Sequence, residues 1–586
     1  MEISLSCIDS WTPWGSLQSP GLDNRRTKGS LRPLSGSKGE STEPNWLSTL
    51  SPVSPRFYNC LGPRHKNKMT VNWYFVLSII IVSCGSIPKG YDEGGYSASV
   101  GLKSFETDFN LLASNWKNDA NGLATLEGNI KSFSVLGAAC GTLIALLIND
   151  RLGRLRSFQL AICLWMSGLF MQIFASGIIG LLLFARIWAG LGAGILTVVS
   201  PLYLSEIAPT KSRGMVVTVY MVFLLSFLMF GETLSFFINF GANKGLLSGR
   251  MQYRLVQAIP LIPVGLALVG SFFLSDTPRW LASKGRVVEA TAALERLRKS
   301  TQDDEALATE RADIQDQAHH QTENLSQSSI WTIFKEIATD SNYRERFLLG
   351  AAVQTIAQWT GGNGITFYIP QIFKLAGVTS SDQSLITSGA YGAVKLVFTM
   401  LFAWCLVDIW GRRKTMFTGL WLQAVAHAWM AIYMSLFSDG SNKHASNAAI
   451  ASVFIYAVGW SIGLCNTQAL YGTEIYPTRI RSVCYAFNMM LHWFFQFAVV
   501  RVTPNMFVGL GVSGAYIFWT CVCAVGILLL GVWAPETKGV PMERMDELFS
   551  GPWYMGWRAK ISPSADPLAG TDTGKDIKEV TIERVA

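Results

Sequence analysis

Asp150-Arg151-Leu152-Gly153-Arg154 begins a motif that this chain carries twice. The first copy continues with Ser205-Glu206-Ile207-Ala208-Pro209-Thr210-Lys211-Ser212-Arg213. The second copy, about 260 residues later, reads Asp408-Ile409-Trp410-Gly411-Arg412-Arg413-Lys414 and then Thr473-Glu474-Ile475-Tyr476-Pro477-Thr478-Arg479-Ile480-Arg481. Each copy lies between long apolar runs, which indicates that the repeated unit is a bundle of membrane-spanning helices.

Composition agrees with a membrane protein. Of the 586 residues, 50% are hydrophobic and 15% are charged, which excludes an ordinary soluble protein of this size. A helix needs about 20 apolar residues to cross a bilayer. About twelve stretches meet this length, six in each half, near 73–98, 126–148, 157–178, 181–203, 214–240, 253–275, 346–373, 384–407, 415–436, 448–471, 483–507 and 514–533. We therefore predict an all-α integral membrane protein of two six-helix halves.

The distribution of charge predicts how the chain is oriented. The net charge of +8 comes mostly from Lys and Arg in alternate loops, which is typical of cytoplasmic loops and not of a nucleic-acid-binding surface. An even number of spans then places both termini in the cytoplasm. We expect an N-terminal half at 71–275, a cytoplasmic linker at 276–345, a C-terminal half at 346–535 and a cytoplasmic tail at 536–586. Residues 1–70 are either a disordered cytoplasmic tail or an over-extended gene model.

The charged loop motifs carry two interpretations. Gly153 and Gly411 suit tight turns between helices, and the charges around them exclude these turns from the bilayer, so the motifs could act as topology anchors alone. Because Glu206 and Glu474 lie at matching positions in the two halves, we favour a charge network that latches neighbouring helices and acts as a gate. The predicted gating residues are Asp150, Arg151, Arg154, Glu206, Arg213, Asp408, Arg412, Arg413, Glu474 and Arg481.

Six motifs in a fixed order over residues 72–550 resemble the signature set of the sugar-porter family of the major facilitator superfamily. Besides the two Asp/Gly/Arg motifs they are Tyr203-Leu204-Ser205-Glu206-Ile207-Ala208-Pro209, Thr277-Pro278-Arg279-Trp280-Leu281, Gln358-Trp359-Thr360-Gly361-Gly362-Asn363 and Pro535-Glu536-Thr537-Lys538-Gly539. The segments at 392–395, 501–507 and 539–543 look most similar to fungal quinate permeases and their hexose-transporting relatives. The resemblance implies a twelve-helix fold, alternating access and, commonly, proton symport.

Two charges inside the spans fall at one depth. Asp92 lies about 18 residues beyond the cytoplasmic start of the first span, and Arg186 lies about 17 residues before the cytoplasmic end of the fourth. A charge within a span needs a partner or a wet cavity, so an Asp92–Arg186 pair is expected. The resemblance implies that this pair couples transport to a proton. The alternative is a structural ion pair without proton traffic.

The second half supplies the substrate candidates. The resemblance implies that Gln358 and Asn363 bind substrate hydroxyls and that Trp493 packs on the substrate ring. Met221, Ala357 and Ala469 replace family residues that grip a hexose. Lys395 and His492 lie at about the depth of Gln358, so the three could converge on one site that is more cationic than a glucose site. Alternatively, Lys395 braces the bundle and His492 is a hydrogen-bonded core residue.

These observations predict a plasma-membrane transporter that imports a monosaccharide or a quinate-like polyhydroxy acid by proton symport. A facilitative hexose uniporter and a non-transporting nutrient receptor on the same fold are the alternatives. No catalytic motif is present, so an enzyme is not expected. Ten scattered cysteines have no metal-ligand spacing, and we expect no metal and no cofactor. The expected partners are the small-molecule substrate, a proton and the lipid bilayer, without nucleic acid, for a monomeric protein.

Overall fold

The computed structural model describes residues 72–208, 213–246, 249–298, 311–312, 330–402, 407–437, 442–538, 540 and 545–559. All of them belong to one compact unit, Met69–Ala586. The described residues form helices and connecting segments, and no strand occurs among them. The tail predicted at 1–70 lies outside the described residues.

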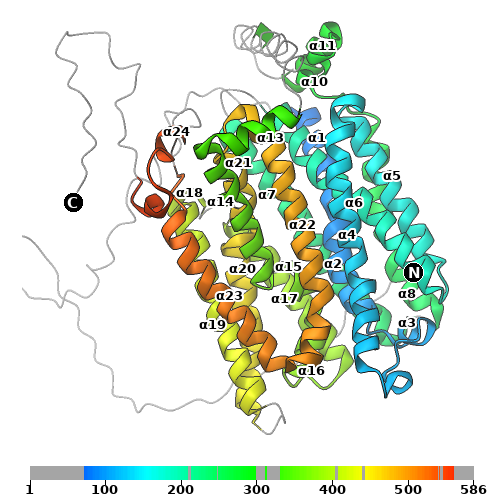
Figure 1. The fold of residues 1–586 in the computed structure, drawn as a ribbon. Coiled ribbons are helices and arrows are strands. Elements are labelled where there is room, and N and C mark those ends of the chain that lie inside the picture. The colour runs from blue at the N-terminus through cyan, green and yellow to red at the C-terminus, as the bar shows by residue number, and fades with distance from the viewer. Residues whose placement is uncertain are drawn as a thin grey trace, which may run out of the picture. The chain divides into compact units, whose positions relative to one another are not determined.

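The first half of the unit contains six predicted spans, drawn from blue to green in Figure 1. In chain order, its helices are α1 (Trp73–Ser83), η2 (Cys84–Ser86), α2 (Ile87–Ser99), α3 (Lys103–Asp108), η3 (Ala113–Trp116), α4 (Ala120–Leu152), α5 (Arg154–Ile173), α6 (Ile179–Ile207), α7 (Arg213–Gly241), η5 (Ala242–Leu246), α8 (Arg250–Ala258) and α9 (Leu261–Ser271). The segments α1, η2 and α2 together make the first span, Trp73–Ser99.

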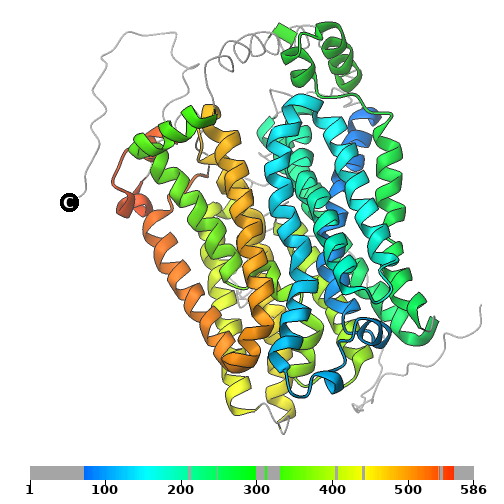
Figure 2. The same ribbon diagram turned by 45° about the vertical axis from the view of Figure 1, so that its right-hand side comes forward.

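The second half follows a connection that contains α10 (Pro278–Ser283), α11 (Val287–Arg298) and α13 (Ile330–Thr339). Its helices are α14 (Ser341–Trp359), α15 (Gly362–Thr366), α16 (Ile369–Leu375), α17 (Ser381–Leu401), α18 (Val407–Trp410), α19 (Arg412–Leu436), α20 (Lys443–Ile462), α21 (Leu464–Glu474), α22 (Thr478–Gly509) and α23 (Gly511–Trp533). The short α24 (Met545–Leu548) and η8 (Trp553–Arg558) come last. Figure 2 shows the two halves beside each other.

Nine of the described helical segments are long and apolar enough to cross a bilayer. They coincide with nine of the predicted spans. The other three predicted spans are also helical, as α5, α14 to α16, and α19. Charges near the start of each helix, such as Arg154, Arg346 and Arg412, make these segments less apolar, and the break after Trp359 shortens the continuous helix of the seventh span. The described part of the chain thus has the predicted all-helical architecture.

Small residues let the helices approach one another closely. A Cβ atom added at Gly137 of α4 would lie 2.2 Å from the carbonyl oxygen of Ile187 on α6, and one at Gly190 would lie 2.1 Å from that of Ser134. Small residues at helix contacts are typical of membrane bundles, because lipid supplies no hydrophobic force between helices. The same reasoning accounts for the close approach of α2 to α7, where a Cβ at Gly90 would lie 1.8 Å from Leu228 O.

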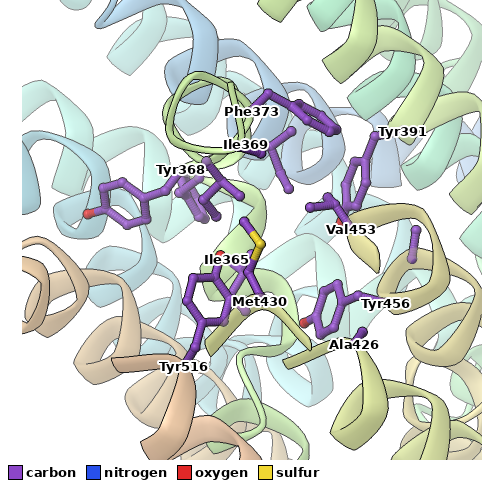
Figure 3. Packing of buried hydrophobic residues seen from close by; sticks show 14 of the residues in the cluster. Ile365, Tyr368, Ile369, Phe373, Tyr391, Ala426, Met430, Val453, Tyr456 and Tyr516 are labelled. Carbon is purple, nitrogen blue, oxygen red and sulfur yellow. The ribbon is translucent and has the colours of Figure 1, made fainter. Parts of the chain in front are cut away.

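The halves meet along α4 with α22 and along α7 with α17. One buried cluster runs across this interface, since it joins Val135 and Phe236 of the first half to aromatic residues of the second. Figure 3 shows part of it, including Tyr368, Tyr391 and Tyr456. Large apolar side chains such as Phe273 and Leu528 remain exposed on the outer faces, as expected where lipid covers the protein.

The seventh predicted span is interrupted rather than continuous. Helix α14 ends at Trp359, and Gly361 adopts a φ of +96°, which favours glycine. The chain resumes as α15 and then as α16, which has Pro370 in its first turn. Broken helices are tolerated at membrane depth where the freed backbone lies inside the protein, and here Tyr456 Oη donates to Gly362 O at 2.9 Å.

Candidate functional site

We call the end of the unit that carries the Gly153 and Gly411 turns the motif end, and the end that carries α3 and α16 the opposite end (Figure 1). The basic residues of the alternate loops predict that the motif end faces the cytoplasm. The predicted coupling and substrate residues lie inside the helices, and those at the motif end lie at helix termini.

Asp92 of α2 and Arg186 of α6 are in direct contact, Asp92 Oδ1 accepting from Arg186 Nη1. Arg186 is fully buried, whereas Asp92 keeps 17% of its side chain exposed. Arg186 also donates from Nε to Ile130 O at 2.8 Å and from Nη2 to Lys131 O at 2.9 Å. Its guanidinium lies 3.7 Å from the centroid of the Tyr96 ring. Two backbone carbonyls of α4 therefore hold Arg186 independently of Asp92.

Lys395 of α17 forms an ion pair with Glu232 of α7, and Nζ lies 2.9 Å from each carboxylate oxygen. Both side chains are fully buried, and Thr366 Oγ1 lies 3.3 Å from Nζ. The pair joins the two halves. The partner Glu232 was not predicted from the sequence, although a carboxylate inside the apolar run 214–240 was a visible signal. Lys395 therefore has its counter-ion within the protein.

A second polar bridge between the halves starts at Glu93, the neighbour of Asp92 on α2. Gln496 Nε2 of α22 donates to Glu93 Oε1 at 3.0 Å, and both side chains are buried. Lys89, one turn earlier, has Nζ 4.0 Å from Glu93 Oε1 and 4.4 Å from the centroid of the Trp493 ring. The ammonium of Lys89 thus occupies the face of the tryptophan that was predicted to pack on substrate.

The amide of Gln358 meets His492, with 3.0 Å between Nε2 and Nδ1. Gln354, one turn earlier on α14, also reaches this nitrogen at 3.2 Å through Oε1. The structure brings Gln358 and His492 together as their depths suggested. Lys395 makes its hydrogen bonds with Glu232 and Thr366 instead. The side chain of Asn363 lies outside the described residues.

Several buried polar atoms near these residues have no hydrogen-bond partner within the described part of the protein. They include Glu93 Oε2, Gln358 Oε1, Trp493 Nε1 and Gln496 Oε1. Buried polar atoms in native proteins are nearly always paired with protein, water or ligand. This set offers three acceptors and one donor, which suits a solute with several hydroxyl groups, because a hydroxyl both donates and accepts.

At the motif end, the first motif copy forms one hydrogen-bonded group. Arg154, at the start of α5, donates from Nη2 and Nε to Glu206 Oε1 at 2.9 and 3.1 Å, and from Nη1 to Asp150 Oδ1 at 3.1 Å. Thr277 Oγ1 donates to Glu206 Oε2 at 2.5 Å. This group ties the end of α6 to the start of α5 and to the segment before α10.

The second copy repeats this arrangement. Arg412 Nη2 lies 2.9 Å from Glu474 Oε1, and Thr537 Oγ1 donates to Glu474 Oε2 at 2.8 Å. Arg413 Nη2 donates to Gly531 O at 2.7 Å, and Arg481 donates to Tyr476 O. Arg412, Glu474 and Thr537 thus make the same contacts as Arg154, Glu206 and Thr277. The repeat in the sequence is also a repeat in the structure.

A carboxylate also caps each helix after the turn. Asp276 accepts from the backbone N–H of Arg154 at 3.1 Å and of Leu155 at 3.3 Å, and Glu536 accepts from those of Arg412 at 2.9 Å and Arg413 at 3.2 Å. Burial raises the pKa of the Asp276 carboxyl, although its backbone hydrogen bonds act in the other direction.

The remaining predicted gating residues are less informative. Arg151 is exposed at the end of α4. The side chains of Arg213 and Asp408 lie outside the described residues.

Residues 77–549 match the family of sugar (and other) transporters. The chain is a sugar porter of the major facilitator superfamily. Sugar porters of this family are multi-pass membrane transporters and not enzymes, so the two repeated halves belong to a transporter.

Curated relatives of this sugar porter include fungal permeases. A probable quinate permease of Aspergillus flavus is 30% identical over 490 residues, covering 82% of this chain and 89% of the relative. The quinate permease of Neurospora africana is 28% identical over 497 residues, covering 82% and 90%.

Solved structures share the fold of this sugar porter. The xylose transporter XylE from E. coli, in a partially occluded inward open conformation, has a TM-score of 0.65 at 20% identity and covers 80% of this chain and 99% of its own. XylE bound to 6-bromo-6-deoxy-D-glucose has a TM-score of 0.66 at 21% identity and covers 82% and 100%. The likeness identifies the major facilitator fold.

Proposed function

We propose that this sugar porter imports a polyhydroxylated solute, either a monosaccharide or a quinate-like polyhydroxy acid, together with a proton across the plasma membrane. The single observation that carries the proposal is the position of two neighbouring residues on α2. Asp92 holds Arg186 within the first half, and Glu93 holds Gln496 of the second half. A change at Asp92 is therefore transmitted directly to a contact between the halves.

Protonation of Asp92 removes the negative charge that faces Arg186 and weakens one of the three hydrogen bonds of its guanidinium. The guanidinium keeps its hydrogen bonds to Ile130 O and Lys131 O, so the buried charge still has hydrogen-bond partners. The Asp92–Arg186 tie between α2 and α6 is then weakened, while Arg186 stays attached to α4. A proton thereby weakens one tie of α2 and favours a rearrangement of the Glu93–Gln496 bridge around substrate.

The partnerless oxygens of Gln358 and Gln496 and the indole nitrogen of Trp493 support a polyhydroxylated substrate. They lie on α14 and α22 of the second half, whereas Glu93 comes from the first. A solute bound by both sets stabilises the closed arrangement of the halves, which is the requirement for alternating access. The names of the quinate permease relatives support an acid as one candidate substrate.

The test is uptake in a yeast strain that lacks its own hexose uptake. Labelled glucose, galactose, xylose, lactose and quinate are offered in parallel at pH 5 and pH 7.5, with cells that lack the transporter as control. We expect accumulation of at least one solute above its outside concentration at pH 5, and loss of accumulation when a protonophore is added. Equilibration without accumulation identifies a uniporter, and the absence of uptake for every solute contradicts the proposed import of these solutes.

A further inference from the structure

The described spans contain several basic side chains, and those placed well inside them include Lys89, Lys131, Arg186 and Lys395. Three of them face a carboxylate. The pairs are Lys89 with Glu93, Arg186 with Asp92, and Lys395 with Glu232. Lys131 of α4 differs from them. It is fully buried, and its Nζ has no hydrogen-bond partner among the described residues.

The surroundings of Lys131 hold its charge without neutralising it. Nζ lies 4.0 Å from the centroid of the Tyr368 ring, and an aromatic face attracts a cation but carries no net charge. Glu127 lies one turn earlier on α4, but its Oε2 accepts from Gln371 Nε2 at 3.1 Å, and it forms no ion pair with Lys131 in the part of the chain that the structure describes. The Lys131 ammonium therefore feels the charge of Glu127 at longer range but has no anion in direct contact among the described residues.

Lys131 lies where the two halves meet. Tyr368 belongs to the second half, directly before α16, and its hydroxyl donates to Val500 O of α22 at 2.7 Å. Figure 3 shows Tyr368 in the buried cluster that crosses the interface. The carbonyl of Lys131 also accepts from Arg186 Nη2 at 2.9 Å, so this residue adjoins the Asp92–Arg186 pair.

A second cation lies one turn nearer the opposite end. A Cβ atom added at Gly128 of α4 would lie 3.4 Å from Arg501 Nη1 of α22. Arg501 is half-buried. Arg501 and Lys131 are therefore two basic side chains about one turn apart where α4 packs against α22.

We propose that Lys131 is the recognition site for the carboxylate of an acidic polyhydroxylated substrate. The proposal rests on the proposed function, which it refines by substrate class: the carboxylate gives Lys131 its counter-ion, and a neutral sugar does not. Lys395 is excluded from this role because Glu232 already holds it with both oxygens.

The experiment measures the concentration dependence of uptake for quinate, quinic acid methyl ester and D-xylose in the yeast strain described above. The variants are Lys131→Met, Lys131→Arg and Lys374→Met, the last being a control on α16 with an exposed side chain. Surface expression is quantified for each. We expect Lys131→Met to raise the apparent KM for quinate at least tenfold with less than a twofold change for the two neutral solutes. Lys131→Arg should retain most of the affinity for quinate, and Lys374→Met should behave like the wild type.

A second measurement, thermal unfolding of purified protein, tests quinate binding even if a variant reaches the cell surface poorly. Quinate should raise the unfolding temperature of the purified wild-type protein and of Lys131→Arg, but not that of Lys131→Met. The inference is overturned if Lys131→Met binds quinate within twofold of the wild type, or if it loses quinate and neutral solutes equally. Uptake of neutral sugars alone by the wild type overturns it as well, while leaving the transport function intact. Absence of all uptake instead refutes the proposed function.

Discussion

Lys395 of α17 and Glu232 of α7 form a fully buried ion pair that joins the two halves of this sugar porter. Removing one partner of such a pair leaves an uncompensated buried charge, which costs about 3–5 kcal/mol. Replacing both partners by neutral residues removes that penalty. Replacing one partner of this pair should therefore destabilise the protein more than replacing both partners.

The first prediction follows from this difference. We expect Lys395→Met and Glu232→Gln each to lower the unfolding temperature and the surface expression, and the double variant to be more stable than either single variant. Thermal unfolding of the four purified proteins measures the coupling. A double variant whose loss equals the sum of the single losses would show that the two residues act independently.

A second prediction concerns Asp92. The variant Asp92→Asn mimics the protonated acid permanently, so it removes the pH-dependent step and keeps the path. Accumulation should fall to a ratio of about 1 between inside and outside, while exchange of labelled for unlabelled substrate continues, because no proton gradient is then used. Concentrative uptake at the wild-type level in this variant would refute the role of Asp92 in coupling.

The third prediction concerns the groups at the motif end. Glu206→Gln and Glu474→Gln each remove one charge that holds an arginine and a threonine. We propose that these groups stabilise the arrangement in which the motif end is closed, so the variants should favour open forms at that end and lower turnover more than surface expression. Labelling of cysteines introduced at the motif end measures opening. Arg156→Gln, on the exposed face of α5, is the control, and equal labelling in all variants would return Glu206 and Glu474 to topology anchors.

The sequence predicted the depth of charged residues in the bundle more accurately than it predicted which residues they contact. Asp92 and Arg186 were expected to meet because residue counts give height along a helix at about 1.5 Å per residue. Lys395 was placed near Gln358 and His492 by the same count, yet its side chain pairs with Glu232. Height does not give the direction in which a helix faces, and only packing against neighbouring helices determines that. The overlooked Lys131 has the same explanation, since its lack of a partner appears only once α4 is packed against the second half.

The fourth prediction uses the Asp276 cap. Because burial raises its pKa in the folded protein, the folded state binds a proton here more readily than the unfolded state. The stabilisation from this group is complete below the unfolded pKa, near 4, and is lost as pH rises through the higher folded value. Asp276→Asn should lack this dependence, so the stability of the wild type relative to the variant should fall as pH increases from about 4 and then level off. Thermal unfolding of both proteins between pH 4 and pH 7 provides the measurement, and parallel curves would contradict the prediction.

The last prediction separates hydroxyl recognition from recognition of charge. Gln358→Leu removes an amide whose Oε1 has no partner among the described residues, while Gln354 Oε1 remains 3.2 Å from His492 Nδ1 to hold the ring. If Gln358 binds a substrate hydroxyl, the loss should cost about 1–3 kcal/mol, or roughly 5- to 150-fold in apparent affinity. Neutral and acidic solutes should be affected alike, unlike the effect expected at Lys131. Thr355→Ala on the same helix is the control, because its hydroxyl bonds to Ala351 O within α14 at 2.8 Å. Unchanged affinities for every transported solute in Gln358→Leu would place Gln358 outside the binding site and leave its contact with His492 as a packing interaction.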